Sequence, residues 1–86
     1  MAQNDKKGEI TWKNQHIPYI GKVLKSLRMA KNLTQQQLSN LCGITRPYIS
    51  MLERNVKQPT LTIIFLLAAG LGMKASELVK EIENYC

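Results

Sequence analysis

Two short helical patterns separated by one glycine-centred turn are the strongest constraint on how this chain can fold. The first pattern covers about residues 35–42, and Gly43 marks its end because glycine readily adopts the left-handed conformation of a helix stop. The second begins near Thr45, and polar side chains occupy its outer face. Apolar residues recur on the inner face of each pattern: Leu38, Leu41 and Cys42, then Ile49 and Leu52. The sequence predicts two short helices joined by a tight turn.

Three more helical patterns flank this unit, so the sequence predicts an all-α domain of five helices. The first runs from Pro18 to about Asn32, the fourth covers about residues 61–71 after the cap candidate Thr60, and the last begins at Ser76. The side chains expected in the core from the first and fourth helices are Ile20, Val23, Leu24, Leu27, Leu61, Ile64, Leu67, Ala68 and Leu71. On the last helix, Leu78, Val79 and Ile82 share the apolar side.

The chain of 86 residues has the length of one domain, which we place at residues 17–86. Residues 1–16 show no sustained period and are expected to form an N-terminal arm. This arm is interpreted as flexible, with a packed or dimer-swapped arm around Trp12 as the alternative. The sequence contains neither a secretion signal nor an apolar run of roughly 20 residues, which favours a cytoplasmic location and no membrane contact.

The composition gives little support to an enzyme or a metal protein. Cys42 and Cys86 form neither a disulfide framework nor a metal quartet, and His16 is the single histidine. Phosphate loops and nucleophile motifs are absent, so we expect no cofactor, metal or small-molecule ligand. Twelve Lys and Arg residues against six Asp and Glu give a formal net charge of +6, which favours nucleic acid or an anionic membrane surface as the partner. The spread of the lysines over several elements disfavours the membrane.

Over about residues 20–82, the motifs of the chain resemble those of the Xre or Cro/repressor-type helix-turn-helix proteins of bacteria and phages. The matching elements are Arg28, Leu33-Thr34-Gln35, Leu38, Gly43-Ile44-Thr45, Tyr48-Ile49-Ser50, Leu52-Glu53-Arg54-Asn55, Pro59-Thr60-Leu61, Leu67-Ala68 and Leu71-Gly72. This resemblance implies a five-helix lambda-repressor-like domain that usually dimerises. It also implies that the third helix enters the major groove of DNA while the second crosses the phosphate backbone.

The outer face of the third helix supplies the candidate base readers. They are Arg46, Pro47, Tyr48, Ser50 and Met51. Arg46 is the preferred reader because its planar guanidinium can donate two hydrogen bonds to guanine, with a phosphate contact as the alternative. Ser50 can bond a base edge, whereas Tyr48 and Met51 offer apolar contact to a thymine methyl. Pro47 stands where relatives often carry a polar reader, so one base position would be read only by shape.

A second group of residues is expected to contact phosphates: Gln35, Thr45, Arg54, Asn55, Lys57 and Thr60. Gln35 lies in the first turn of the second helix, where free N–H groups attract an anion. The resemblance implies that its amide bonds a phosphate and buttresses Arg46, although Gln35 could also be a solvated glutamine. Lys57 could likewise be a solvated turn lysine.

The resemblance assigns a structural role to two more charged residues. It implies that Arg28 and Glu53 form an ion pair between the first and third helices, which fixes the angle of the reading helix. The alternative is two independent surface charges.

Excess apolar surface on the fourth helix indicates a partner chain. Ile63, Phe65 and Leu66 are apolar where related sequences often carry polar side chains, so we expect a homodimer with Phe65, Leu66 and Val79 in its interface. The alternative is a fourth helix that is buried all round within one chain.

Together these features predict a sequence-specific DNA-binding transcriptional regulator, acting as a repressor or autoregulator on a palindromic operator. A controller protein of a restriction-modification locus is a close variant, because the run from Tyr48 to Asn55 resembles those proteins. The alternative from another class is an antitoxin that binds a protein toxin as well as DNA.

Overall fold

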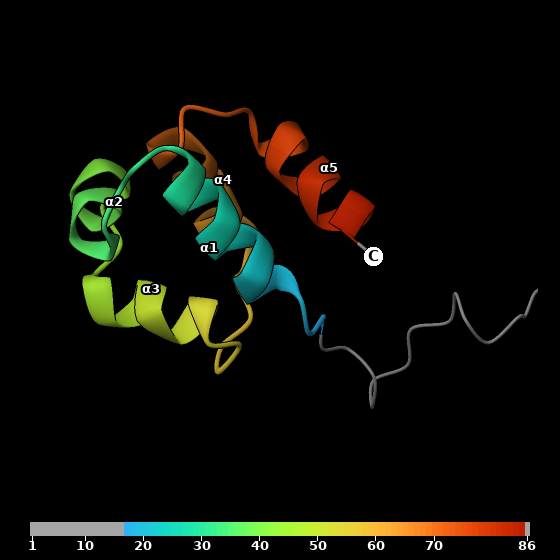
Figure 1. Ribbon diagram of the computed structural model, residues 1–86, viewed down its shortest axis with the longest axis horizontal. Helices are drawn as coiled ribbons and strands as arrows, with labels where there is room; N and C mark the ends of the chain where they lie inside the picture. The colour runs from blue at the N-terminus through green and yellow to red at the C-terminus, as the bar shows by residue number, and fades with distance from the viewer. Residues whose placement is uncertain (1–16, 86) are drawn as a thin grey trace, which may run out of the picture.

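The computed structural model describes residues 17–85 and contains five helices and no strand in that range (Figure 1). The helices are α1 (Ile20–Ala30), α2 (Gln35–Cys42), α3 (Arg46–Glu53), α4 (Leu61–Gly70) and α5 (Ala75–Tyr85). The prediction of an all-α, five-helix domain is confirmed. The predicted arm of residues 1–16, with Trp12 and His16, lies outside the described residues, as does Cys86.

Local sequence signals explain where α2 and α4 begin. Thr34 Oγ1 accepts a hydrogen bond from the Gln37 N–H at 3.0 Å, and the Gln37 side chain accepts one from the Thr34 N–H at 2.8 Å. This reciprocal pair satisfies two backbone donors at the start of α2. Thr60 Oγ1 caps α4 in the same way by accepting from the Ile63 N–H. Thr45 occupies the N-cap position of α3 without a side-chain cap bond.

Left-handed residues end several helices, and the stop predicted at Gly43 is one of them. Asn32, Gly43, Asn55 and Gly72 all have positive φ values, between 58° and 77°. The start of α5 differs from the prediction, since the helix begins at Ala75 and not at Ser76. The physical reason is that the Glu77 carboxylate accepts a hydrogen bond from the Lys74 N–H at 2.8 Å and so starts the helix one residue earlier.

One apolar core joins all five helices. Its buried members are Ile20, Val23, Leu24, Leu38, Cys42, Ile44, Ile49, Leu52, Ile64, Leu67, Ala68, Leu71, Leu78 and Ile82. Two residues predicted to face inward are exposed instead: Leu41 and Leu61. In each case another residue of the same helix fills the core position, because a helix of about ten residues turns only one narrow stripe toward its neighbours.

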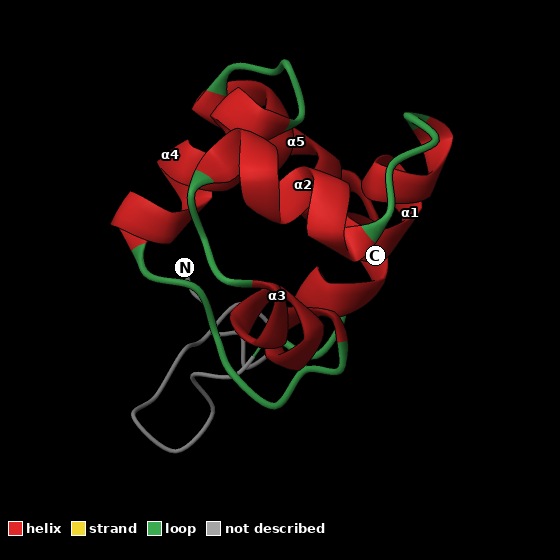
Figure 2. Cartoon of the chain, turned by 90° about the vertical axis from the view of Figure 1, so that its left-hand side faces the viewer, coloured by secondary structure: helices red, strands yellow, loops and turns green. Residues whose placement is uncertain are grey.

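The helices α2 and α3 lie away from α5 (Figure 1). The helix α2 packs on both α3 and α4, while α1 packs on α3 and α5. Seen from the left-hand side of Figure 1, α2 and α3 are at the front of the domain (Figure 2). The stacked rings of Tyr19 and Tyr85, with centroids 5.4 Å apart, join the start of α1 to the end of α5.

The close crossing of α1 and α3 depends on Gly21. This glycine is buried, and a Cβ atom added to it would lie 2.6 Å from the carbonyl oxygen of Leu52 and also against that of Glu53. Both obstacles are backbone atoms, so relief requires the two helices to separate. Glycine at this position therefore sets the distance between α1 and α3.

We expect Gly21→Ala to destabilise the domain by about 1–3 kcal/mol or more, because overpacking against backbone cannot relax through a side-chain rotamer. Urea unfolding measures this change. Ser26→Ala, at an exposed position of the same helix, is the control and should shift the stability by less than about 0.5 kcal/mol. Equal stability of the two variants would contradict the close-crossing argument.

Candidate nucleic-acid interface

The turn between α2 and α3 consists of residues 43–45 and is held by specific bonds. The Gly43 N–H donates to the Ser39 carbonyl at 2.9 Å, and the Ser39 hydroxyl donates to the Ile44 carbonyl at 2.5 Å. Ile44 is buried in the core and anchors the middle of the turn. The angle between α2 and α3 is therefore fixed on both the polar and the apolar side of the turn.

A buried polar network joins α1, α2 and α3 around Glu53. Arg28 donates from Nε and Nη2 to the two carboxylate oxygens of Glu53, at 2.6 and 3.0 Å, and from Nη1 to the Leu33 carbonyl at 2.7 Å. The Gln35 amide donates to Glu53 Oε1 at 3.0 Å. The side chains of Arg28 and Glu53 are only 11% and 3% exposed. The helix α3 is thus held at its C-terminal end by groups from two other helices.

The hydrogen bond that Arg28 donates to Glu53 raises the pKa of the Arg28 guanidinium above its usual value, while burial acts in the opposite direction. Arginine is already protonated at all ordinary pH values. The guanidinium consequently stays charged, and Glu53 is its buried counter-ion.

The outer face of α3 presents most of the predicted base readers. Arg46 and Pro47 are exposed in the first turn, and Ser50 and Met51 are half-buried. Tyr48 is also half-buried, and its side chain packs against the core. Ser50 Oγ accepts a hydrogen bond from Arg54 Nε at 3.3 Å. Arg46 is therefore the member of the group that projects most freely from the start of α3.

The predicted phosphate-contact residues are not equally available. Thr45, Arg54 and Lys57 are exposed, as is Thr60, whose hydroxyl oxygen caps α4. Both ends of the Asn55 amide are used within the protein, because its oxygen accepts from the Gly21 N–H and its nitrogen donates to the Pro18 carbonyl. Only one amide N–H of Asn55 is left for a phosphate, so its main role in the described structure is to connect α3 with the start of α1.

Gln35 has a partner inside the protein in addition to the phosphate that the resemblance implies. Its amide donates to Glu53 at the end of α3, whereas Arg46 lies at the start of that helix. The half-buried Gln35 still stands in the first turn of α2, beside backbone N–H groups that have no partner inside the helix.

Charge is divided unevenly over the described surface. Between residues 32 and 60, the cations are Arg46, Arg54 and Lys57, all exposed, and the single carboxylate is the buried Glu53. The exposed carboxylates of residues 17–85 all lie in α5. The surface formed by α2, α3 and the following turn is therefore positive without compensating acidic groups, which suits a polyanion.

One functional candidate, Gln58, was missed by the sequence analysis. Its side-chain amide bonds both backbone polar groups of Ile17, 41 residues away in the chain. No periodic pattern or turn signal connects positions so far apart, so only the tertiary structure reveals this contact.

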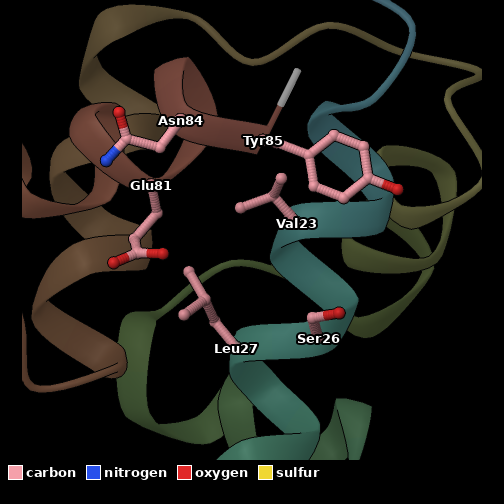
Figure 3. Close-up of a pocket in the computed structure, with 6 residues that line it drawn as sticks. All are labelled: Val23, Ser26, Leu27, Glu81, Asn84 and Tyr85. Carbon is pink, nitrogen blue, oxygen red and sulfur yellow. The ribbon is translucent and has the colours of Figure 1, made fainter.

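The described surface has shallow hollows but no deep site. Figure 3 shows one between α1 and α5, with a volume of about 150 Å³, lined by Val23, Ser26, Leu27, Glu81, Asn84 and Tyr85. Two other hollows have volumes of about 410 and 470 Å³, within the range of ligand pockets at roughly 300–1,000 Å³, but both are open along the surface of the domain. Among residues 17–85, His, Cys, Asp and Glu side chains do not gather in any group of three that could hold a metal ion.

No single helix of the described chain is long and apolar enough to cross a membrane. The helices α4 and α5 reach that apolar length only when taken together, and the pair is bent by 102°.

Known proteins with similar sequences agree with this arrangement of α2 and α3. The Helix-turn-helix family model covers residues 24–78, which include the whole of α2 and α3. An uncharacterized HTH-type transcriptional regulator, y4dJ of Sinorhizobium fredii, is 37% identical over 60 residues, which are 70% of this chain and 78% of that protein. The immunity repressor protein of Bacillus phage phi105 is 32% identical over 62 residues. That match spans 72% of this chain but only 43% of the phage protein.

A solved structure shares the fold as well as the sequence pattern. The restriction-modification controller protein C.AhdI from Aeromonas hydrophila superposes with a TM-score of 0.68 at 35% identity, covering 72% of this chain and 94% of that one. The lambda-repressor-like fold predicted from the motifs is thereby confirmed. The chain belongs to the Xre/Cro-type helix-turn-helix family of DNA-binding transcription regulators.

Proposed function

We propose that this protein is a homodimeric regulator that binds a palindromic operator by inserting the start of α3 into the major groove. The observation that carries the proposal is the surface of α3 and the turn after it, where three exposed cations stand without an exposed carboxylate. This is the electrostatic footprint of a DNA-binding face, and it coincides with the helix that the family uses for reading.

In the proposed complex, Arg46 reads a base pair. Its exposed position in the first turn of α3 lets the guanidinium reach guanine O6 and N7 with two parallel hydrogen bonds. Ser50, one turn further along, contacts a neighbouring base edge after releasing Arg54. Pro47 contributes shape alone, and the half-buried Tyr48 and Met51 supply apolar contact at the edge of the groove.

Phosphate contacts flank the reading helix on both sides. The N-terminus of α2 offers its free N–H groups together with the Gln35 amide, and Thr45 adds a hydroxyl group at the start of α3. Beyond α3, Arg54, Lys57 and Thr60 face the backbone of the next stretch of DNA. Such contacts set the register of the protein on the duplex and give the affinity its salt dependence.

The dimer is proposed to form through the outer faces of α4 and α5. Leu61, Phe65, Leu66 and Val79 are exposed, and Leu61, Phe65 and Val79 line an apolar groove of about 470 Å³. These exposures favour a partner chain over an α4 that is buried all round within one chain. A second copy would cover the groove and would place two copies of α3 on one face of the duplex, about 34 Å apart.

Phe65→Glu is expected to make the protein monomeric. A glutamate at the centre of an apolar interface loses an aromatic anchor and buries an unpaired charge, so association should weaken by at least about 30-fold. Folding should change little, since Phe65 is 58% exposed in one chain. Sedimentation equilibrium measures the association.

Met29→Glu is the matched control for this experiment. Met29 is 57% exposed, as Phe65 is, but it lies on α1 outside the groove. The control should keep the association of the natural protein. Dimers that persist in Phe65→Glu, or that are lost equally in both variants, would refute the proposed interface.

Selection of bound sites from random duplex DNA tests the function as a whole. The expected result is an enriched palindrome whose half-sites are separated by about one helical turn, as a two-fold symmetric protein requires. Recovery of no enriched motif would refute sequence-specific binding. The named relatives include a repressor and a controller protein, so repression or autoregulation is the proposed outcome of binding, in the cytoplasm where the DNA lies. The same comparisons favour a regulator over an antitoxin.

A further inference from the structure

We propose that Gln58 is a positioning residue for DNA binding, which holds the turn between α3 and α4 so that Lys57 is presented to a phosphate. The inference rests on the proposed function, because it explains how the proposed phosphate contact of Lys57 is held in place. Gln58 itself need not touch DNA. Its action is to fix the backbone of its neighbour in the chain.

The geometry of Gln58 is that of a clip between two distant segments. Its Oε1 accepts a hydrogen bond from the Ile17 N–H at 3.1 Å, and its Nε2 donates to the Ile17 carbonyl at 3.3 Å. A primary amide that pairs with both polar groups of one residue reproduces the two-bond exchange of neighbouring β-strands. The turn is thereby tied to the segment that leads into α1.

Further bonds hold the same turn from its other side. The N–H groups of Val56 and Lys57 donate to the Met51 carbonyl at 2.9 and 3.3 Å, so the start of the turn is fastened to α3. Asn55 fastens it to Gly21 and Pro18. Lys57 therefore lies between Asn55 and Gln58, and Gln58 supplies the anchor on its C-terminal side.

The two hydrogen bonds between Gln58 and Ile17 contribute little to the stability of the fold. Gln58 and Ile17 lie outside the buried core, and both hydrogen bonds are exposed to solvent. Exposed bonds of this kind add little net stability, since water replaces them easily. Fixing the turn in advance does benefit binding, because a disordered Lys57 backbone would have to be ordered at the moment of contact.

The experiment measures the salt dependence of binding to a mixed-sequence duplex of about 30 base pairs, where phosphate contacts dominate affinity. The test variant is Gln58→Met, which keeps the length of the side chain and removes both hydrogen bonds. We expect the affinity of the dimer for the duplex to fall roughly 5- to 150-fold. The reason is that each of the two copies must then order the Lys57 side chain and its turn at the moment of binding. The slope of log K against log salt should decrease by up to about 0.9 per protomer. The urea midpoint should stay at the value of the natural protein.

A double-mutant cycle shows whether Gln58 acts through Lys57. Lys57→Gln alone should lower the slope by about 0.9 per protomer, and Gln58→Met should have no further effect on the slope in that background. Lys80→Gln is the charge-matched control, because Lys80 is an exposed lysine of α5 far from the reading surface in sequence and fold. It should leave the slope unchanged.

The possible failures are distinguishable. If the natural protein shows no salt-dependent binding to any duplex, the proposed function is wrong. If binding occurs but Lys57→Gln leaves the slope unchanged, the phosphate role of Lys57 is wrong and the inference fails with it. If Lys57→Gln lowers the slope while Gln58→Met does not, or if their effects simply add, the positioning role of Gln58 is overturned alone.

Discussion

Glu53→Ala is expected to destabilise the domain by about 3–5 kcal/mol, because it leaves the buried Arg28 guanidinium without its counter-ion. Arg28 loses two of its three hydrogen-bond acceptors, and the Gln35 amide loses its acceptor in the same step. For a domain of this size, such a loss is a large share of a total stability of roughly 5–15 kcal/mol. Equilibrium unfolding in urea measures the difference.

The double variant Arg28→Met/Glu53→Leu distinguishes a buried charge from a general packing defect. It removes both charges and fills their space with apolar atoms, which is often neutral or stabilising at a buried ion pair. We expect it to be clearly more stable than Glu53→Ala alone. If the double variant lost as much stability as the sum of its two single substitutions, Arg28 and Glu53 would form an ordinary surface ion pair. The same would follow if Glu53→Ala lowered the stability by less than about 1 kcal/mol.

Loss of Glu53 should also affect DNA binding beyond its effect on stability. The carboxylate lies at the C-terminal end of α3 and connects that helix to α1 and to the first turn of α2. Without it, α3 and the phosphate site proposed at Gln35 are no longer held in one arrangement. Binding measured under conditions where the variant remains folded should therefore still be weaker than that of the natural protein.

Much of the local structure was predictable because its causes are local. The caps at Thr34 and Thr60, the left-handed stops at Gly43 and Asn55, and the two buried residues of α3 each follow from a few neighbouring positions. The spacing of these signals also matches the helix-turn-helix pattern, so the order and type of the helices could be read without coordinates.

The remaining features depend on contacts between distant segments. Leu61 was expected in the core, but a nearly uniform apolar helix such as α4 has no periodic contrast to show which face is inside. The Asn55 and Gln58 bonds to residues 17–21 join positions 34 to 41 residues apart. Polar residues in a turn give no sign in the sequence of which distant backbone group they bind.

Arg46→Ala is expected to change sequence preference more than any other substitution on the reading surface. A bidentate arginine–guanine contact is worth about 1–3 kcal/mol of discrimination. The proposed dimer would make this contact twice, so the free energy of operator binding should weaken by roughly 2–6 kcal/mol. Stability should be nearly unaffected because Arg46 is exposed in the first turn of α3. Competition binding with the selected operator and with mixed-sequence DNA measures both affinities.

The variant Lys57→Ala should lose affinity in a different way from Arg46→Ala, because Lys57 is proposed to contact a phosphate and not a base. It should weaken binding to every duplex by a similar factor and leave the selected motif unchanged, because a phosphate oxygen is the same at each base pair. Arg46→Ala should instead erase the preference at one position of each half-site and bring operator binding close to the non-specific level. If site selection with Arg46→Ala returned the motif of the natural protein, only more weakly, Arg46 would be a phosphate contact. Sequence reading would then have to come from Ser50 and from the shape of the groove against Pro47.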